Sequence, residues 1–197
     1  MAFLEPVTLD GRHVRIEPLA HEHADGVRAA AADGELWRLW YTSVPAPDRT
    51  TEWIDIALDM RTRLGAMPFV VREKPVGDIV GATRYFNVDA TNRRLEIGHT
   101  WYAKRVQRSA VNTECKLLLL EHAFETLGCM RVEFKTDARN ARSRGALEAL
   151  GCRFEGIHRK HMLVRGGDVR DSAYYSVLDV DWPVVRERLR ARVEQAA

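Results

Sequence analysis

The sequence predicts a mixed α/β fold, with one sheet of six to seven strands and helices on both faces. Segments that alternate apolar and polar residues, as strands do, are interleaved with segments whose apolar residues recur every three to four positions, as in helices. The chain has 197 residues, of which 46% are hydrophobic and 29% charged. This is enough for one buried core and short for two, and no repeat or low-complexity linker divides the chain. We therefore expect residues 1–197 to form a single domain.

The first third of the chain predicts one strand and two helices. In residues 12–19, Val14 and Ile16 alternate with charged residues, which is typical of a half-buried strand. Residues 21–33 are rich in alanine, the strongest helix former, and a glycine ends the run. Over residues 48–64 apolar residues recur at helical spacing, after an aspartate that can cap the first turn.

Three strands and a central helix are expected next. Residues 69–71, 79–86 and 95–102 have strand composition, and the turns between them contain proline, glycine, aspartate and asparagine. They are expected to pair as an antiparallel meander. Residues 112–127 show helical spacing, and four consecutive leucines, Leu117 to Leu120, make this helix apolar nearly all round. Such a helix is expected to be central rather than peripheral.

The remainder adds a strand over residues 132–136 and a helix over residues 140–150, which a glycine ends. Residues 153–164 and 169–180 flank a pair of glycines, a strong signal for a β-hairpin. A terminal amphipathic helix begins at residues 181–183, with proline in its first turn. Strands and helices thus alternate in the second half, as a mixed sheet requires.

Composition argues against several function classes. The formal net charge is +2, and basic residues are scattered among acidic ones, so a nucleic-acid partner is not expected. No apolar run approaches the length of a membrane span, and the N-terminus lacks a basic segment followed by an apolar stretch. We expect a cytoplasmic protein with no membrane partner.

Cysteine and histidine spacing predicts neither a disulfide framework nor a metal site. Cys115, Cys129 and Cys152 are far apart in apolar surroundings, as expected of small buried hydrophobic residues in a reducing compartment. The histidines at 21 and 23, and those at 158 and 161, have no convincing third ligand, so solvated or structural roles are favoured.

The most informative segment is the polar loop between the strand 95–102 and the leucine-rich helix. The loop reads Gln107-Arg108-Ser109-Ala110-Val111-Asn112. The first N–H groups of a helix have no partner within it, and they carry the positive end of the helix dipole, so they suit a phosphate. The alternative is an ordinary polar loop between a strand and a helix.

This order of a strand, a loop that contains Gln107 and a long helix resembles the acyl-CoA pyrophosphate loop of the GCN5-related N-acetyltransferase (GNAT) superfamily. The resemblance is strongest to its ribosomal-protein N-terminal acetyltransferase-like (RimJ/RimL-like) branch. That loop has the form Gln/Arg-x-x-Gly-x-Gly/Ala, and here Ala110 and Asn112 stand in place of its small residues. Alanine is tolerated where φ is negative, and asparagine can cap a helix. The resemblance implies a GNAT fold.

A second motif extends the resemblance. Asn140 and Ser143 open the helix after the next strand, like the Asn-x-x-Ser signature of the branch. In relatives the Asn bonds the pantetheine or nearby backbone, and the Ser faces the thioester sulfur. The run Leu150 to Gly156 also matches the family. The alternative for Asn140 is a plain helix cap. Three arginines nearby, Arg139, Arg142 and Arg144, could meet the adenosine phosphate or coat the helix, and coating is favoured for at least two of them.

Two residues compete for the role of general base. The resemblance assigns it to Glu96, on the strand that precedes the loop, and His99 is the competitor. Strand alternation predicts that Glu96, Gly98, Thr100 and Tyr102 share one face, opposite His99. Burial would raise the pKa of a carboxylate, which suits a base. The alternatives are a surface glutamate paired with a neighbouring arginine and a hydrogen-bonded structural histidine.

The resemblance implies an N-acetyltransferase that moves an acetyl group from acetyl-CoA directly to a primary amine, either a protein N-terminus or a small amine, without a metal. Glu96 and Ser143 are the catalytic candidates, with Trp37, Tyr41 and His99 at the acceptor. A backbone N–H near Thr100 to Tyr102 would hold the developing oxyanion. The residues implied to bind the cofactor are Thr100, Trp101, Tyr102, Gln107, Arg108, Ser109, Ala110, Val111, Asn112, Thr113, Asn140 and Ser143.

One alternative keeps the fold without the chemistry. Relatives often supply the leaving thiolate with a proton from a tyrosine one turn beyond Asn140, where this chain has Leu147. Together with the missing loop glycines, this leaves open a non-catalytic acyl-CoA-binding protein of the same fold. The acceptor, the acyl chain preference and the oligomeric state, a homodimer included, are not determined by the sequence.

Overall fold

The computed structural model describes residues 3–39, 44–164 and 166–196. Within them, eight strands join one mixed sheet in the order β1-β2-β3-β4-β5-β6-β8-β7. The strands are β1 (Leu9–Asp10), β2 (Val14–Pro18), β3 (Met67–Glu73), β4 (Ile79–Asp89), β5 (Arg94–Tyr102), β6 (Arg131–Asp137), β7 (Arg153–Leu163) and β8 (Val169–Leu178). The predicted fold class is confirmed, but the sheet has one strand more than expected. The additional strand, β1, has only two residues, too few for an alternating pattern.

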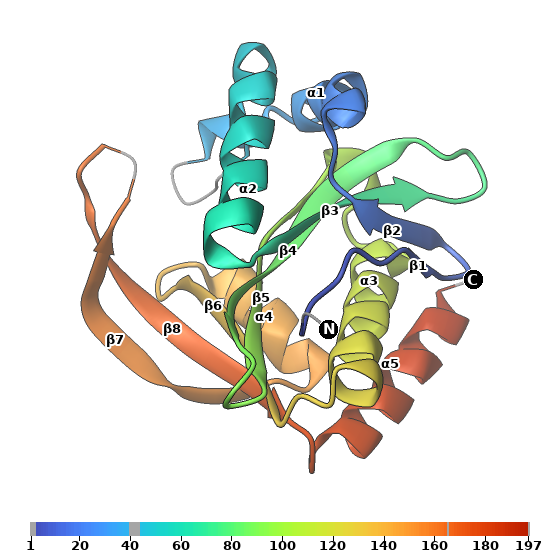
Figure 1. The fold of residues 1–197 in the computed structure, drawn as a ribbon, viewed down its shortest axis with the longest axis vertical. Coiled ribbons are helices and arrows are strands. Elements are labelled where there is room, and N and C mark those ends of the chain that lie inside the picture. Colours follow the sequence, from blue (N-terminus) through green and yellow to red (C-terminus); the bar gives the residue numbers. More distant parts are fainter. Residues whose placement is uncertain (1–2, 40–43, 165, 197) are drawn as a thin grey trace.

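Helices cover both faces of the sheet (Figure 1). The helices are α1 (Ala24–Ala32), α2 (Thr50–Leu64), α3 (Ala110–Glu121), α4 (Ala141–Leu150) and α5 (Trp182–Gln195). α1 and α2 pack on β3 and β4, whereas α3, α4 and α5 lie on the opposite side, where α5 contacts both of the other two. The predicted meander and the hairpin of β7 and β8 are confirmed by their antiparallel registers.

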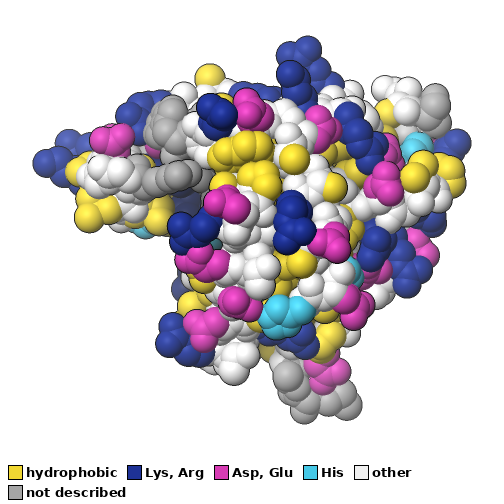
Figure 2. All heavy atoms as spheres, turned by 90° about the horizontal axis from the view of Figure 1, so that it is seen from above, with side chains coloured by type: hydrophobic (Ala, Val, Ile, Leu, Met, Phe, Trp, Pro, Cys, Tyr) yellow, Lys and Arg dark blue, Asp and Glu magenta, His cyan; other side chains and the backbone are white. Residues whose placement is uncertain are grey.

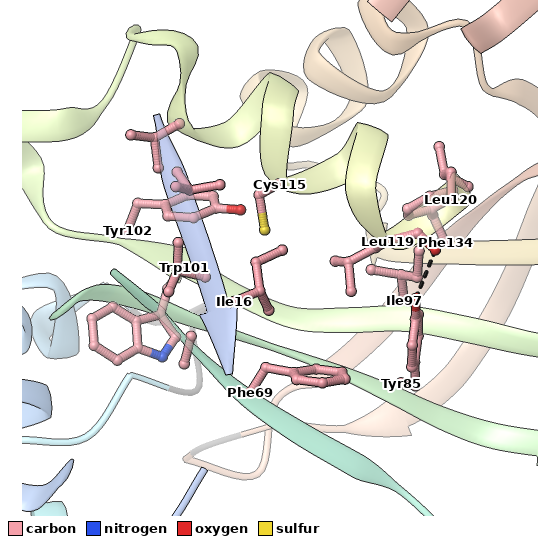
Figure 3. Packing of buried hydrophobic residues seen from close by; sticks show 14 of the residues in the cluster. Ile16, Phe69, Tyr85, Ile97, Trp101, Tyr102, Cys115, Leu119, Leu120 and Phe134 are labelled. Atoms are coloured by element: carbon pink, nitrogen blue, oxygen red, sulfur yellow. Dashed lines mark hydrogen bonds between the residues drawn. The ribbon is translucent and has the colours of Figure 1, made fainter. Parts of the chain in front are cut away.

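α3 lies at the centre of the core, as its leucine run predicts. Leu119 and Leu120 are fully buried, and the Tyr85 hydroxyl donates a hydrogen bond of 2.6 Å to the Leu119 carbonyl (Figure 3). The three cysteines are free and buried, which confirms that they act as core residues. α3 begins two residues earlier than predicted and continues into a π-helical turn, His122–Thr126.

A buried carboxylate joins α3 to the N-terminal strands. Glu114, only 4% exposed, accepts backbone hydrogen bonds from Arg12, His13 and Val14, at 2.8, 2.7 and 2.8 Å. The turn approaches so closely that a Cβ on Gly11 would lie 2.6 Å from the Glu114 carboxyl carbon. One side chain thus satisfies three amide donors and fixes the position of the helix against β2.

The sheet splits between β5 and β6. These parallel strands pair only at Arg94 with Arg131, Leu95 with Val132 and Glu96 with Glu133. β5 nevertheless continues to Tyr102 and β6 to Asp137, both within the described residues. Past the three pairs, each strand presents an unpaired edge to the gap, so a ligand could bond to either backbone.

A β-bulge at His99 changes the faces of β5. The register against β4 shifts between the pairs Ala82–Trp101 and Arg84–Gly98, and His99 has a positive φ of 50°. The prediction that Thr100 and Tyr102 share the face of Glu96 is therefore wrong. Figure 3 shows Tyr102 on the α3 side, near Cys115, and the Trp101 indole on the other side of the strand. The bulge adds one residue to β5 and inverts the alternation beyond it.

Candidate active site

A cleft of about 1230 Å³ occupies the gap between β5 and β6. It extends from the loop before α3, at Gln107 and Ser109, past Glu96 to the aromatic rings of Trp53 and Phe86. The cleft therefore connects a phosphate-suited helix end with a buried carboxylate. On the molecular face drawn in Figure 2, basic and acidic side chains are interspersed, so no block of one charge covers this side.

The loop before α3 keeps amide donors available. Ser109 caps the helix, its hydroxyl accepting from the Val111 N–H at 3.3 Å. Ala110 begins α3 and is absent from the residues with positive φ, so alanine is compatible with the backbone where relatives have glycine. Ala110 and Val111 are buried and are not among the residues that line the cleft, so their predicted contact with a cofactor remains a prediction. Asn112 and Thr113 line the cleft.

Gln107 connects the two sides of the cleft through hydrogen bonds. Its side-chain amide donates to the Tyr102 carbonyl at 2.9 Å, and its carbonyl oxygen accepts from Arg142 of α4 at 2.7 Å. It thereby joins the end of β5 to the helix on the far side of the gap. The other two arginines have structural contacts, Arg139 with Asp137 and Arg144 with the Tyr175 hydroxyl. This agrees with the expectation that at least two of the three coat the helix.

Asn140 and Ser143 lie together at the start of α4. Asn140 is the N-cap, and its side-chain oxygen accepts from the Ser143 N–H at 3.0 Å. Both side chains line the cleft and are half-buried. The cap occupies the Asn140 oxygen and orients the first turn of α4, which carries the Ser143 hydroxyl at the cleft wall. Their roles toward a ligand remain predictions.

Glu96 is a buried carboxylate at the point where the strands separate. It is 1% exposed and lines the cleft. Oε2 accepts from the Asn87 amide at 2.9 Å and lies 3.4 Å from Lys135 Nζ, whereas Oε1 is buried with no hydrogen-bond partner among the described residues. Burial raises the pKa of Glu96, against the opposing effects of Lys135 and Asn87. A surface pairing with a neighbouring arginine, the alternative from the sequence, is wrong because the side chain points inward.

His99 lies on the same side of the cleft, at the bulge. Its ring contacts Phe86 edge-on, with 5.0 Å between ring centres. A Cβ on the neighbouring Gly98 would lie 2.6 Å from that phenyl ring, so glycine makes room for the contact. Burial, with added repulsion from Arg84, Lys135 and Arg170, lowers the pKa of His99 to about 3. The imidazole is therefore neutral at physiological pH.

The other predicted acceptor residues are placed less directly. Trp37 is half-buried, and its segment contributes Leu36 and Leu39 to the described cleft wall. Tyr41 lies outside the described residues. Trp101 packs edge-on against Trp53 of α2, with 6.2 Å between ring centres, and both rings line the cleft. Apart from the helical spacing that includes Trp53, nothing in the sequence predicted its contact with Trp101.

Sequence reasoning missed a buried lysine in the cleft. Lys116 of α3 is 4% exposed, and its Nζ donates to the Thr100 hydroxyl at 2.8 Å and lies 5.8 Å from the centre of the Phe134 ring. Thr100 is hydrogen-bonded in turn to Thr83, at 2.8 Å. Burial lowers the pKa of Lys116. A lysine beside four leucines in a helix predicted to be buried all round was the signal that could have found it.

Lys116→Met is expected to raise the free energy of unfolding by about 1 kcal/mol, because it removes a buried ammonium that has no carboxylate within 4.0 Å in the described structure. It is also expected to weaken binding of CoA, since the lysine is a hydrogen-bond donor in the cleft. Urea denaturation and calorimetric titration with CoA measure the two effects. A loss of stability comparable to a Leu119→Ala variant would contradict the first expectation.

A helix start that faces a split between two parallel strands, with a buried carboxylate at the branch point, defines the class of GCN5-related acyltransferases. The chain belongs to the acetyltransferase (GNAT) domain family, whose family model matches residues 13–153. It is 34% identical over 106 residues to YdaF of Bacillus subtilis (strain 168), whose name assigns it provisionally to the ribosomal N-acetyltransferases. The match covers 54% of this chain and 57% of YdaF.

Solved structures agree over nearly the whole chain. A GCN5-related N-acetyltransferase from Brucella melitensis has a TM-score of 0.87 at 32% identity, covering 98% of this chain and 87% of that one. A provisionally named acetyltransferase from T. thermophilus has a TM-score of 0.84 at 36% identity, covering 96% and 98%. RimL, a ribosomal L7/L12 acetyltransferase solved with coenzyme A, shares the fold at 14% identity, with a TM-score of 0.73 and coverage of 87% and 98%. The predicted family is confirmed, and the similarity to YdaF agrees with the predicted branch.

Proposed function

We propose that the protein transfers an acetyl group from acetyl-CoA to a primary amine, with Glu96 as the base. The observation that carries this proposal is the position of Glu96 in the cleft that begins at the α3 N-terminus, where one oxygen of this buried carboxylate has no hydrogen-bond partner in the described part of the chain. Free amides at that helix end fit a diphosphate, and the unpaired strand edges fit the amide-rich arm that follows it. The residues present therefore fit acetyl-CoA.

Glu96 is the better base of the two candidates. A base must accept a proton from an ammonium group, and a group with a pKa of about 3, such as His99, does so poorly. The raised pKa of Glu96 brings the carboxylate closer to the pKa of the amine. His99 is better suited to form the neutral wall of the acceptor site.

The reaction needs few further groups. Once Glu96 has taken one proton from the ammonium, the neutral amine would attack the thioester carbonyl, so that an N–C bond forms and the C–S bond breaks, and the second proton lost by the nitrogen would go to the departing thiolate to give the free thiol. A backbone N–H near the bulge, between Thr100 and Tyr102, would stabilise the oxyanion. The Ser143 hydroxyl would donate a hydrogen bond to the departing thiolate. None of the three cysteines lines the cleft, which favours direct transfer over an acyl-cysteine.

The names of YdaF and RimL extend the proposal to a protein N-terminus as one acceptor, with small amines as the other. The described chain has no helix long and apolar enough to span a bilayer. A non-catalytic acyl-CoA-binding protein is the second candidate, favoured by Leu147 where relatives have tyrosine and by the missing glycines of the loop before α3.

Calorimetric titration with acetyl-CoA, followed by thiol release with a panel of amines, tests the function. We expect a dissociation constant in the range of about micromolar to millimolar, and thiol release that depends on the amine. Binding without amine-dependent thiol release would support the binding protein instead. No binding in this range would contradict both.

A further inference from the structure

The amine end of the cleft contains more positive than negative charge. Glu96, the buried carboxylate that lines this end, already has a cationic partner in Lys135 at 3.4 Å, and the nearby buried Asp137, which does not line the cleft, is paired with Arg139 at 3.1 Å. In the described part of the chain, Arg170 has no carboxylate within 4.0 Å. Because these carboxylates are already paired with other cations, the Arg170 guanidinium is available to bind a ligand.

Arg170 is placed to meet such a ligand. It lies on β8, lines the cleft and is half-buried, and its Nε is buried with no hydrogen-bond partner among the described residues. It interacts electrostatically with Asp137 and Glu96, which places it near the base. A guanidinium with an unused donor is the group that best binds a carboxylate in two-point fashion.

A second cation strengthens the positive potential. Arg84 is 3% exposed, lies 5.9 Å from the centre of the Trp53 ring and has a buried Nε without a partner in the described structure. Burial lowers its pKa to about 10, so it remains charged at neutral pH. Together with Arg170 and Lys135, it acts on His99 at the acceptor wall. A polycationic acceptor would be repelled here.

Most of the remaining wall is apolar, with Trp53, Ile56, Phe86, Trp101 and Met162 among the residues that line the cleft. Arg49 and Glu52 also line it, but they are ion-paired with each other. The wall therefore suits an uncharged side chain better than a charged one.

We propose that the acceptor is a free amino acid with an apolar side chain, whose amine meets Glu96 and whose carboxylate binds Arg170. This inference rests on the proposed acetyl transfer and narrows its acceptor class. It follows from charge balance: the carboxylate of Glu96 suits the ammonium, and the surplus guanidinium suits the second charge of a zwitterion.

Acetylation kinetics with three matched amines test the inference. Phenylalanine, phenylalaninamide and phenethylamine have the same ring and amine, but only the first has a carboxylate. A peptide that begins with phenylalanine tests a protein N-terminus. We expect kcat/KM to be higher for phenylalanine than for the other three by about tenfold or more, because they leave Arg170 unpaired.

Arg170→Met is expected to remove this preference and Arg170→Lys to retain part of it. Arg190→Met, on the exposed face of α5, is the control and should leave the preference unchanged. Titration of the CoA-saturated protein with phenylalanine and its amide gives a binding readout independent of turnover. Equal kcat/KM for the amino acid and phenethylamine, preference for the peptide, or a preference that survives in Arg170→Met would overturn the inference while leaving acetyl transfer intact. Absence of thiol release with every amine would overturn the proposed function itself.

Discussion

Replacement of Glu96 with glutamine is expected to lower kcat by about 10²- to 10⁴-fold while leaving the affinity for acetyl-CoA within about twofold. Glutamine has nearly the same shape and can still accept from Asn87, but it cannot take a proton from the amine. Steady-state kinetics and calorimetric titration separate the two quantities. Glu187→Gln, an exposed carboxylate on α5, is the matched control.

The same residue should set the acid limb of the pH profile. Burial raises the pKa of Glu96 above its ordinary value, so the carboxylate is lost at a higher pH than for an exposed glutamate. Activity as kcat/KM should therefore fall as the pH decreases through that raised pKa, and Glu96→Gln should remove this limb. An unchanged kcat in the glutamine variant would exclude Glu96 as the base.

Glu114→Ala is expected to lower the free energy of unfolding by about 4 kcal/mol. The substitution leaves the amides of Arg12, His13 and Val14 without their acceptor, and these donors lie in a partly or fully buried turn. Urea denaturation measures the loss. Glu121→Ala, on the same helix but ion-paired with Arg190 near the surface, should cost less than about 1 kcal/mol.

A double-mutant cycle with Gly11 makes this prediction sharper. Gly11→Ala places a methyl group 2.6 Å from the Glu114 carboxyl carbon and should destabilise the wild-type protein. In the Glu114→Ala background the same methyl group has space, so the two effects should not add. Additive effects, or a Glu114→Ala variant as stable as Glu121→Ala, would contradict the assigned role.

Much of the fold could be predicted because its signals are local. The leucine run of α3 and the paired glycines between β7 and β8 each specify one element by spacing or turn chemistry. The bulge at His99 could not be predicted, because one added residue leaves the composition of β5 unchanged while inverting its faces. Alternation therefore placed Thr100 and Tyr102 on the wrong side.

The candidate site was predicted where motif and element coincide. Gln107, Asn140 and Ser143 stand at the ends of predicted elements, and the structure brings them to one cleft with Glu96. Lys116 was missed because a charged residue in a helix ordinarily lies on its exposed face. Partners across the sheet depend on tertiary packing, and no spacing in the sequence encodes them.

The short pairing of β5 with β6 divides the sheet into two blocks that share three residue pairs. A ligand in the gap contacts both blocks, and it can do so only while the chain is folded. Because the ligand binds only the folded chain, it raises the free energy of unfolding, by about 2.7 kcal/mol when the free ligand concentration is a hundred times the dissociation constant. With the proposed acyl donor as that ligand, the stability of the protein would depend on the concentration of its own substrate.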